Sequence, residues 1–141
     1  MTKFEKFSAF LVILLLVLFG YFIYQNIYLP SKMSVDFVCN NNYTSEELEN
    51  HPNVLGYYNS SSDEIYIKEN YTINGTTYLI DNTSIQRTIR HEKIHYIQSL
   101  NNRLYNCNNK FYFTLNEIEA NLMSIFNDKF LNFIYHTNNF F

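Results

Sequence analysis

Two histidines and a glutamate in the middle of the chain have the types and spacing that suit metal-assisted hydrolysis. His91 and His95 stand four residues apart, and Glu92 follows the first of them. On a helix, residues four apart lie on one face, so both imidazoles can reach one zinc ion at about 2.0–2.1 Å. Glu92 lies one step round the helix, where its carboxylate can accept a proton without binding the metal. This HExxH segment predicts a zinc centre with Glu92 as general base.

A third metal ligand must come from elsewhere, because a catalytic zinc usually keeps three protein ligands and one open position. From Glu117 the sequence reads E-I-E-A-N. HExxH followed by ExxA[DN] resembles the gluzincin clan of zinc metallopeptidases, over residues 85–126, less than a third of the chain. The resemblance implies a zincin-like α+β fold and peptide-bond hydrolysis, with Zn²⁺ held by His91, His95 and Glu117 and a zinc-bound water activated by Glu92. It also places Asn121 where the family often has an Asp that orients a ligand histidine.

The role of Glu117 has a structural alternative. Thr114 and Glu117 form a capping-box pattern, in which the glutamate would accept a hydrogen bond from the Thr114 backbone. Glu119 would then be the spare metal ligand. We favour Glu117 as the ligand, because the small Ala120 and Ser124 beside it allow two helices to approach closely.

Further residues could assist the site. Gln98 falls on the same helix stripe as His91 and His95, and the pattern HExxHxxQ is similar to several small peptidase-like families. A helix glutamine is nevertheless more often a solvated residue, which is the interpretation that we favour. Hydrolysis also needs a donor for the developing oxyanion, and the sequence does not separate its candidates, Tyr105, Tyr112 and His136.

Two helices are expected to carry these residues. After residue 81 the apolar period changes from two to about 3.6, which predicts a helix to residue 100, with Thr83 and Gln86 as its capping box. A basic stripe on this helix is interpreted as a solvated face: Arg87, Arg90 and Lys93. The residues expected to face the core are Ile85, Ile89 and Tyr96. A last long helix is expected over residues 115–135.

Short elements are expected before the HExxH helix. Thr44 and Glu47 form a capping box, which predicts a short helix over residues 45–50. Strand-like runs at residues 54–58 and 64–68 predict a hairpin with a longer loop. A second hairpin is predicted from residues 71–73 and 76–80, which flank Asn74-Gly75, the dipeptide best suited to a type I′ turn.

The N-terminal segment predicts a membrane anchor. Residues 7–24 carry no charge, and a helix of this length roughly spans a bilayer core of about 30 Å. Pro30 is expected to end this helix. We therefore divide the chain into an anchor, residues 1–30, and a zincin-like domain, residues 31–141. A cleaved signal peptide is the main alternative. Lysines before the span favour an N-terminus inside and a C-terminal domain outside the cytoplasm.

An extracytoplasmic domain would allow Cys39 and Cys107, the only cysteines, to form a disulfide; two unpaired thiols are the alternative. Sequons could be glycosylated there, although so many asparagines make chance matches common: Asn42, Asn59, Asn70, Asn74 and Asn82.

Charge and composition narrow the function. The net charge is −3 and the basic residues are scattered, so nucleic acid is not an expected partner. The expected partners are a peptide or protein substrate and the lipid bilayer. The sequence therefore predicts a single-pass, membrane-anchored zinc metallopeptidase. The rival hypothesis is an inactive, membrane-displayed binding domain whose zinc site is vestigial or structural. A closed, four-ligand site would favour that rival, and the unused His51 and His136 lie in unrelated contexts.

Overall fold

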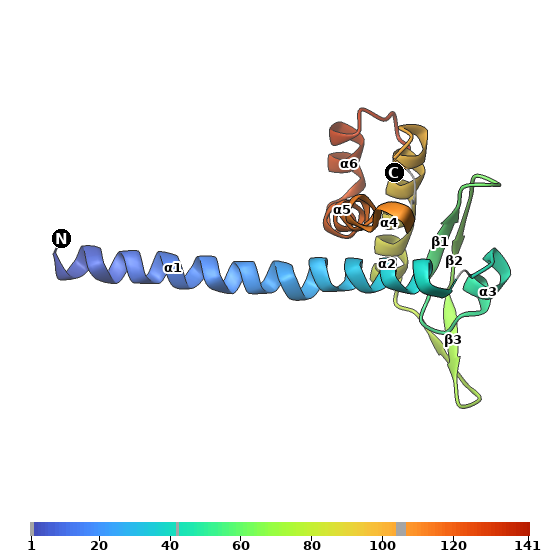
Figure 1. Cartoon of the computed structure of the whole chain (residues 1–141), viewed down its shortest axis with the longest axis horizontal. Helices are drawn as coiled ribbons and strands as arrows, with labels where there is room; N and C mark the ends of the chain where they lie inside the picture. The colour runs from blue at the N-terminus through green and yellow to red at the C-terminus, as the bar shows by residue number, and fades with distance from the viewer. Residues whose placement is uncertain (1, 42, 104–106) are drawn as a thin grey trace.

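The chain is an α+β protein in which one long N-terminal helix carries a small folded domain at its far end (Figure 1). The computed structural model describes residues 2–41, 43–103 and 107–141. Helix α1 (Lys3–Ile23) is capped by Thr2, whose side chain accepts a hydrogen bond from the backbone of Glu5. Nearly all its large apolar side chains are exposed. The helix is long and apolar enough to span a membrane.

Pro30 does not end this helix, contrary to the expectation from sequence. A π-helical turn, η1 (Tyr24–Tyr28), leads directly into helix α2 (Leu29–Asn41). Proline lacks an N–H and crowds the preceding turn, and a wider π turn is one way in which a helix accommodates it. Because helix α5 packs against both η1 and α2, tertiary contacts also favour the continuous helix. The expected boundary at residue 30 therefore falls inside one continuous helix over residues 3–41, which we call the rod.

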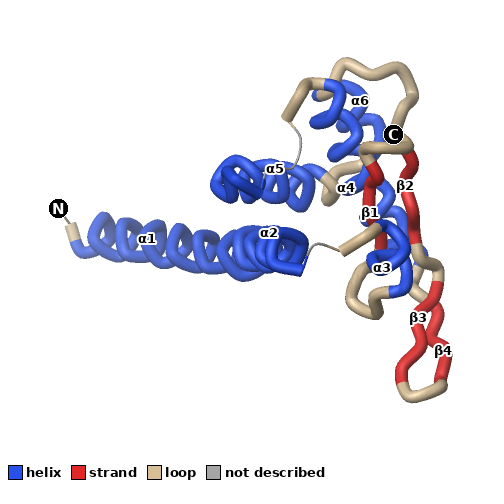
Figure 2. The backbone as a smooth tube through the Cα atoms, turned by 45° about the vertical axis from the view of Figure 1, so that its right-hand side comes forward, coloured by secondary structure: helices blue, strands red, loops and turns tan. Residues whose placement is uncertain are grey.

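Two small hairpins follow the helical rod. Helix α3 (Ser45–Asn50) starts at the predicted capping box of Thr44 and Glu47. Strands β1 (Gly56–Asn59) and β2 (Glu64–Ile67) pair antiparallel and pack against α4. Strands β3 (Asn70–Ile73) and β4 (Thr76–Leu79) form the second hairpin, which projects away from the domain (Figure 2). Its turn has φ values of 50° at Asn74 and 80° at Gly75, as the predicted type I′ turn requires.

Helix α4 (Asn82–Leu100) carries the HExxH segment. It begins one residue after Asp81, whose carboxylate accepts the backbone N–H of Ser84, so the predicted cap at Thr83 is wrong. Its buried apolar residues are Ile94 and Ile97, while the expected core residues are only half-buried: Ile85, Ile89 and Tyr96. The carboxylate of an Asp is a strong N-cap acceptor, which explains the earlier start.

Two residues of the basic stripe of α4, Arg90 and Lys93, are half-buried in packing contacts, whereas Arg87 is exposed as expected. Arg90 donates from Nε to the backbone oxygen of Ser124 at 3.0 Å and pairs with Asp128 at 3.3 Å. Lys93 donates to the backbone oxygen of Phe140 at 2.5 Å. Cationic side chains thus satisfy backbone carbonyls near the C-terminus of the chain.

The last predicted helix is two helices. Helix α5 (Lys110–Met123) follows the 3-10 turn η2 (Cys107–Asn109), and α6 (Asp128–Ile134) follows a break. Asn127 caps α6 by accepting the backbone N–H of Phe130 at 3.0 Å. The polar pair Asn127-Asp128 is a signal for a new helix start inside the expected helix. The Ser124 carbonyl accepts a hydrogen bond from Arg90, which favours the end of α5 at this point.

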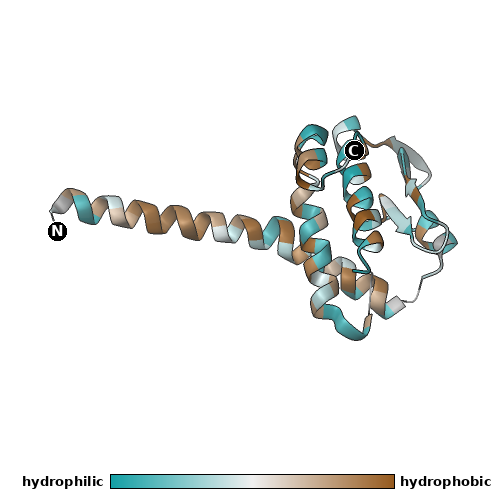
Figure 3. Ribbon diagram, turned by 90° about the horizontal axis from the view of Figure 1, so that it is seen from above, coloured by the Kyte–Doolittle hydropathy of each residue, from teal (hydrophilic) through white to brown (hydrophobic). Residues whose placement is uncertain are grey.

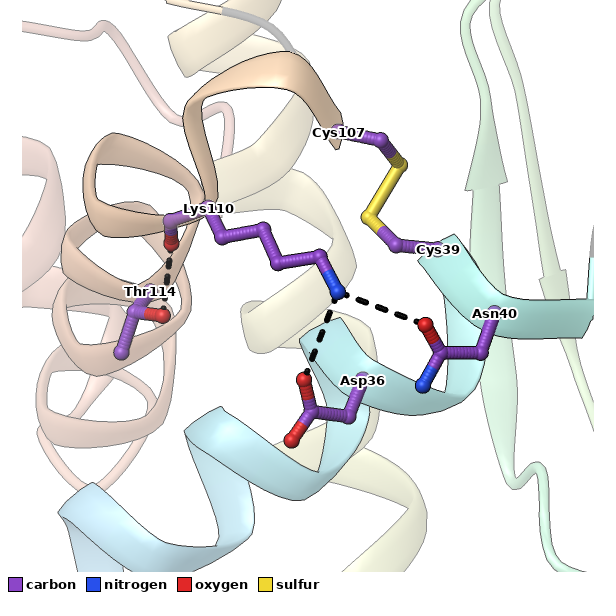
Figure 4. Close-up of a disulfide and its surroundings, with 6 residues drawn as sticks. All are labelled: Asp36, Cys39, Asn40, Cys107, Lys110 and Thr114. Atoms are coloured by element: carbon purple, nitrogen blue, oxygen red, sulfur yellow. Dashed lines mark hydrogen bonds and ion pairs between the residues drawn. A yellow bond between two sulfur atoms is a disulfide. The ribbon is translucent and has the colours of Figure 1, made fainter.

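Helix α5 lies between α2 and α4 and packs against both (Figure 3). Its apolar contact residues Phe113 and Ala120 are fully buried. The end of α2 is joined to the start of α5 by a disulfide between Cys39 and Cys107, whose Cα atoms are 5.4 Å apart. Beside it, the Lys110 ammonium lies 3.8 Å from a carboxylate oxygen of Asp36 (Figure 4). The disulfide therefore fastens the rod to the helix that carries Glu117.

Candidate metal centre

The two histidines of α4 and one glutamate of α5 converge on one point. His91 and His95 lie one turn apart, and their Nε2 atoms are 2.9 Å from each other. The Glu117 carboxylate lies 3.0 Å from His95 Nε2 and 3.6 Å from His91 Nε2. Among the described residues these three form the group with metal-ligating potential.

The donor set fits a small divalent cation. Ligands at about 2.0–2.2 Å from a tetrahedral zinc are separated from one another by roughly 3.3–3.6 Å, which is about 1.63 times the bond length. The observed separations of 2.9, 3.0 and 3.6 Å lie within a few tenths of an ångström of that range. Two imidazole nitrogens and one carboxylate oxygen are also the ligand types that zinc takes in catalytic sites. The residues present could therefore hold such an ion with small side-chain adjustments.

The charges of the group point to the same conclusion. Burial by itself disfavours the charged His95 imidazolium, but the adjacent Glu117 carboxylate outweighs burial and raises the His95 pKa to about 9. Burial likewise opposes ionisation of Glu117, while His95 and His91 hold its pKa below the ordinary value. A buried carboxylate against two imidazoles thus requires a cation between them, either a proton or a metal ion.

Glu92 lies beside this group without belonging to it. Its side chain is buried and lines the same cavity as the two histidines and Glu117. Burial raises the pKa of its carboxyl group, against the opposing influence of His91 and His95. The backbone of Tyr58 on β1 donates a hydrogen bond to it. A carboxylate whose pKa lies above the usual range, next to a cation site, is suited to accept and return a proton.

Gln98 is buried in the site, although a solvated position was expected. Its Oε1 lies 2.8 Å from Nδ1 of His95, and its Nε2 donates to the Asn116 backbone oxygen at 3.0 Å and to Glu119 at 3.1 Å. An amide held this way accepts the Nδ1–H of His95, so Nε2 is the ring nitrogen directed at Glu117 and the one that a metal ion could take in place of a proton. The spacing HExxHxxQ was the signal in the sequence that pointed to this residue.

The remaining candidate ligands and helpers lie elsewhere. Thr114 is inside α5 and donates to the Lys110 backbone oxygen, so it forms no capping box with Glu117. Glu119 faces Arg103 at 3.0 Å and accepts from the Tyr135 hydroxyl at 2.9 Å. The side-chain amide of Asn121 donates to the Ser31 hydroxyl on α2 at 2.9 Å. The residue that contacts the ring of His95 is Gln98, not Asn121 as the family resemblance implied.

Of the expected oxyanion donors, the two that lie in the described part of the chain do not line the metal group. Tyr112 is 63% exposed on the outer part of α5, His136 is exposed near the C-terminus, and Tyr105 lies outside the described residues. Two tyrosines that the sequence did not single out, Tyr57 and Tyr58, line the cavity from β1. The Tyr58 hydroxyl is engaged with Asp63 at 2.5 Å, which leaves Tyr57 as the cavity tyrosine.

Two cavities border the centre, and both are lined by His91, Glu92 and Glu117. The inner one has a volume of about 180 Å³, and its apolar wall comes from α2, α3 and the loop before β1: Phe37, Val38, Leu48 and Val54. The wider one, of about 780 Å³, extends along the rod to Asn26 and Pro30. Gly56 lets β1 lie against α4 here, because a Cβ atom would come within 2.7 Å of Thr88 Cγ2. A bound chain segment could therefore reach the metal group from the wider cavity.

The chain matches no model of a known protein family, and no curated protein or solved structure is significantly similar to it.

Proposed function

We propose that the chain is a membrane-anchored zinc metallopeptidase of the gluzincin type, with a zincin-like domain outside the cytoplasm. One observation carries the proposal: His91, His95 and Glu117 converge at ligand spacing beside a cavity that also contains the buried Glu92. Three ligands next to a cavity resemble an open catalytic site, whereas structural zinc sites are usually closed by four.

Each residue of the site has a distinct task. The two imidazoles and the Glu117 carboxylate hold the ion, and Gln98 keeps His95 in the tautomer that can bind it. A zinc ion held by these residues would supply Lewis acidity toward a carbonyl group and a water molecule. Glu92 accepts the proton that the attacking water loses and returns it to the leaving amine. Burial raises the Glu92 pKa above its ordinary value, which favours a carboxylate that can take up a proton.

The test uses the full chain in lipid nanodiscs, loaded with zinc and given a mixed-sequence peptide library. Glu92→Gln keeps the shape of the side chain and all three proposed ligands. We expect bound zinc to persist while peptide hydrolysis falls by roughly 10²–10⁴-fold, the usual contribution of a general base. Glu64→Gln, on the exposed surface of β2, is the matched control and should leave both quantities unchanged.

Two outcomes would contradict the proposal. If Glu92→Gln hydrolyses peptides at the wild-type rate, Glu92 is not the base. If the wild-type chain binds zinc but cleaves no peptide of the library, the inactive binding domain becomes the better explanation.

A further inference from the structure

Large apolar side chains are exposed where α5 ends and α6 begins. Leu122, Ile125, Phe126 and Phe130 are each 37–51% exposed, and the rings of Phe126 and Phe130 lie 4.6 Å apart. We call these four residues the α5–α6 corner. Clustered apolar exposure of this kind marks an interaction surface.

The outer side of α5 faces the N-terminal end of the rod. The buried residues Phe113, Glu117 and Ala120 face the interior, where α5 packs on α4. Leu122 is two residues beyond Ala120, about 200° round the helix, and so points the opposite way. Figure 1 shows α5 and α6 closer than α4 to the N-terminal end of the rod. The outer side of α5 is therefore directed toward the plane in which a membrane around α1 would lie.

The corner lies at the height of the lipid headgroups. Asn121 contacts Ser31 at 2.9 Å, and Ser31 follows Tyr24, the end of the apolar segment, by seven residues. Seven residues at about 1.5 Å each place the axis of α5, at its contact with Ser31, about 10 Å above the hydrocarbon core. A helix with side chains has a radius of about 5–6 Å, and the headgroup layer is about 5–7 Å thick. Side chains on the outer side of α5 thus reach that layer.

Other residues mark the same level. The rings of Tyr24 and Tyr28 are exposed and stack at 5.5 Å, and tyrosine is enriched at the membrane interface. The π turn that contains them packs directly against α5. The end of the membrane-spanning segment therefore lies against the helix that leads into the corner.

We propose that the α5–α6 corner is inserted in the headgroup layer of the bilayer that α1 spans, so that the domain rests on the membrane and does not stand clear of it. The occupant of the exposed apolar surface is lipid. This inference rests on α1 being a membrane anchor and is independent of whether the metal centre hydrolyses peptides.

The chain contains no tryptophan, so a single introduced Trp reports its own surroundings. The full chain would be placed in phosphatidylcholine vesicles, with and without lipids brominated at the upper part of the acyl chain, which quench nearby Trp. Ile125→Trp probes the corner and Leu122→Trp repeats the measurement at a second exposed site. Leu16→Trp reports the anchor, and Tyr78→Trp, 46% exposed on the projecting hairpin, is the matched control.

We expect emission from Ile125→Trp and Leu122→Trp to be blue-shifted and quenched by the brominated lipid, as for Leu16→Trp, while Tyr78→Trp keeps the emission of an aqueous residue. Quenching at position 16 without quenching at either corner position would overturn the docked arrangement. Absence of quenching at position 16 would show that α1 is not inserted, and the inference would fall with the anchor.

Discussion

Removing the Gln98 side chain should weaken metal binding, because its amide oxygen orients His95. Gln98 is 2% exposed and makes hydrogen bonds to His95, the Asn116 backbone and Glu119. Loss of a group that orients a metal-binding histidine typically lowers metal affinity 10–100-fold, which is about 1.4–2.7 kcal/mol. We therefore expect Gln98→Ala to raise the zinc dissociation constant by roughly that factor.

The same substitution should also destabilise the metal-free protein. Each buried polar partner left without a hydrogen bond costs roughly 1–3 kcal/mol, and the truncated side chain leaves a cavity. A loss of affinity alone would therefore not separate an orienting role from a packing role. Gln98→Glu makes the separation, since it keeps an acceptor for His95 but loses the donor to the Asn116 oxygen and adds a charge beside Glu119.

Affinity and stability should consequently diverge between the two variants. Gln98→Glu should bind zinc at least as tightly as the wild type, because a carboxylate increases the basicity of the histidine, yet unfold at lower urea concentration. Gln98→Ala should be weaker in both respects. The measurements are zinc titration against a chromophoric chelator and urea unfolding of the metal-free chain, both in nanodiscs. Unchanged zinc affinity in Gln98→Ala, together with lower stability, would refute the orienting role.

Three further outcomes are expected. Glu117→Ala should lower zinc affinity by more than 100-fold, because it removes a ligand, whereas Glu119→Ala should change zinc affinity by less than tenfold. Metal titration measures both affinities, and the reverse order would identify Glu119 as the third ligand. Replacing Cys39 and Cys107 by Ser should lower the free energy of unfolding by about 4 kcal/mol, which is the loop-closure entropy expected for a separation of 68 residues. An unchanged midpoint of urea unfolding would contradict this prediction. Zinc at 100 times its dissociation constant should stabilise the folded chain by about 2.7 kcal/mol, and a chelator should reverse this stabilisation. A urea-unfolding midpoint that does not change with zinc would argue against a metal site in the folded protein.

Local patterns in the sequence predicted several elements correctly. The capping box at Thr44 places α3, and Asn74-Gly75 places the turn of the second hairpin, because both depend on neighbouring backbone atoms. The apolar run predicts a helix long enough to span a membrane by composition and length alone. The i, i+4 spacing of His91 and His95 likewise brings their rings together through helix geometry.

Contacts between distant segments decided what these patterns left open. The helix continues through Pro30 where α5 packs against η1 and α2, and the last helix breaks where Arg90 captures the Ser124 carbonyl. Proline is a helix breaker, so propensity favoured the opposite outcome at residue 30. The apolar stripe over residues 115–135 favoured one helix, although Asn127-Asp128 is a local start signal within it.

The metal group shows the same division between local and tertiary information. Helix periodicity fixed the relation of His91 to His95, but it says nothing about which carboxylate of α5 faces them. The crossing of α5 over α4 and α2 turns Glu117 inward and Glu119 toward Arg103. That crossing also buries Gln98 against His95, because an amide with partners on both helices loses little by leaving water. The sequence by itself determined which residues could do the chemistry, and only the packing of two helices far apart in the chain decided which of them meet.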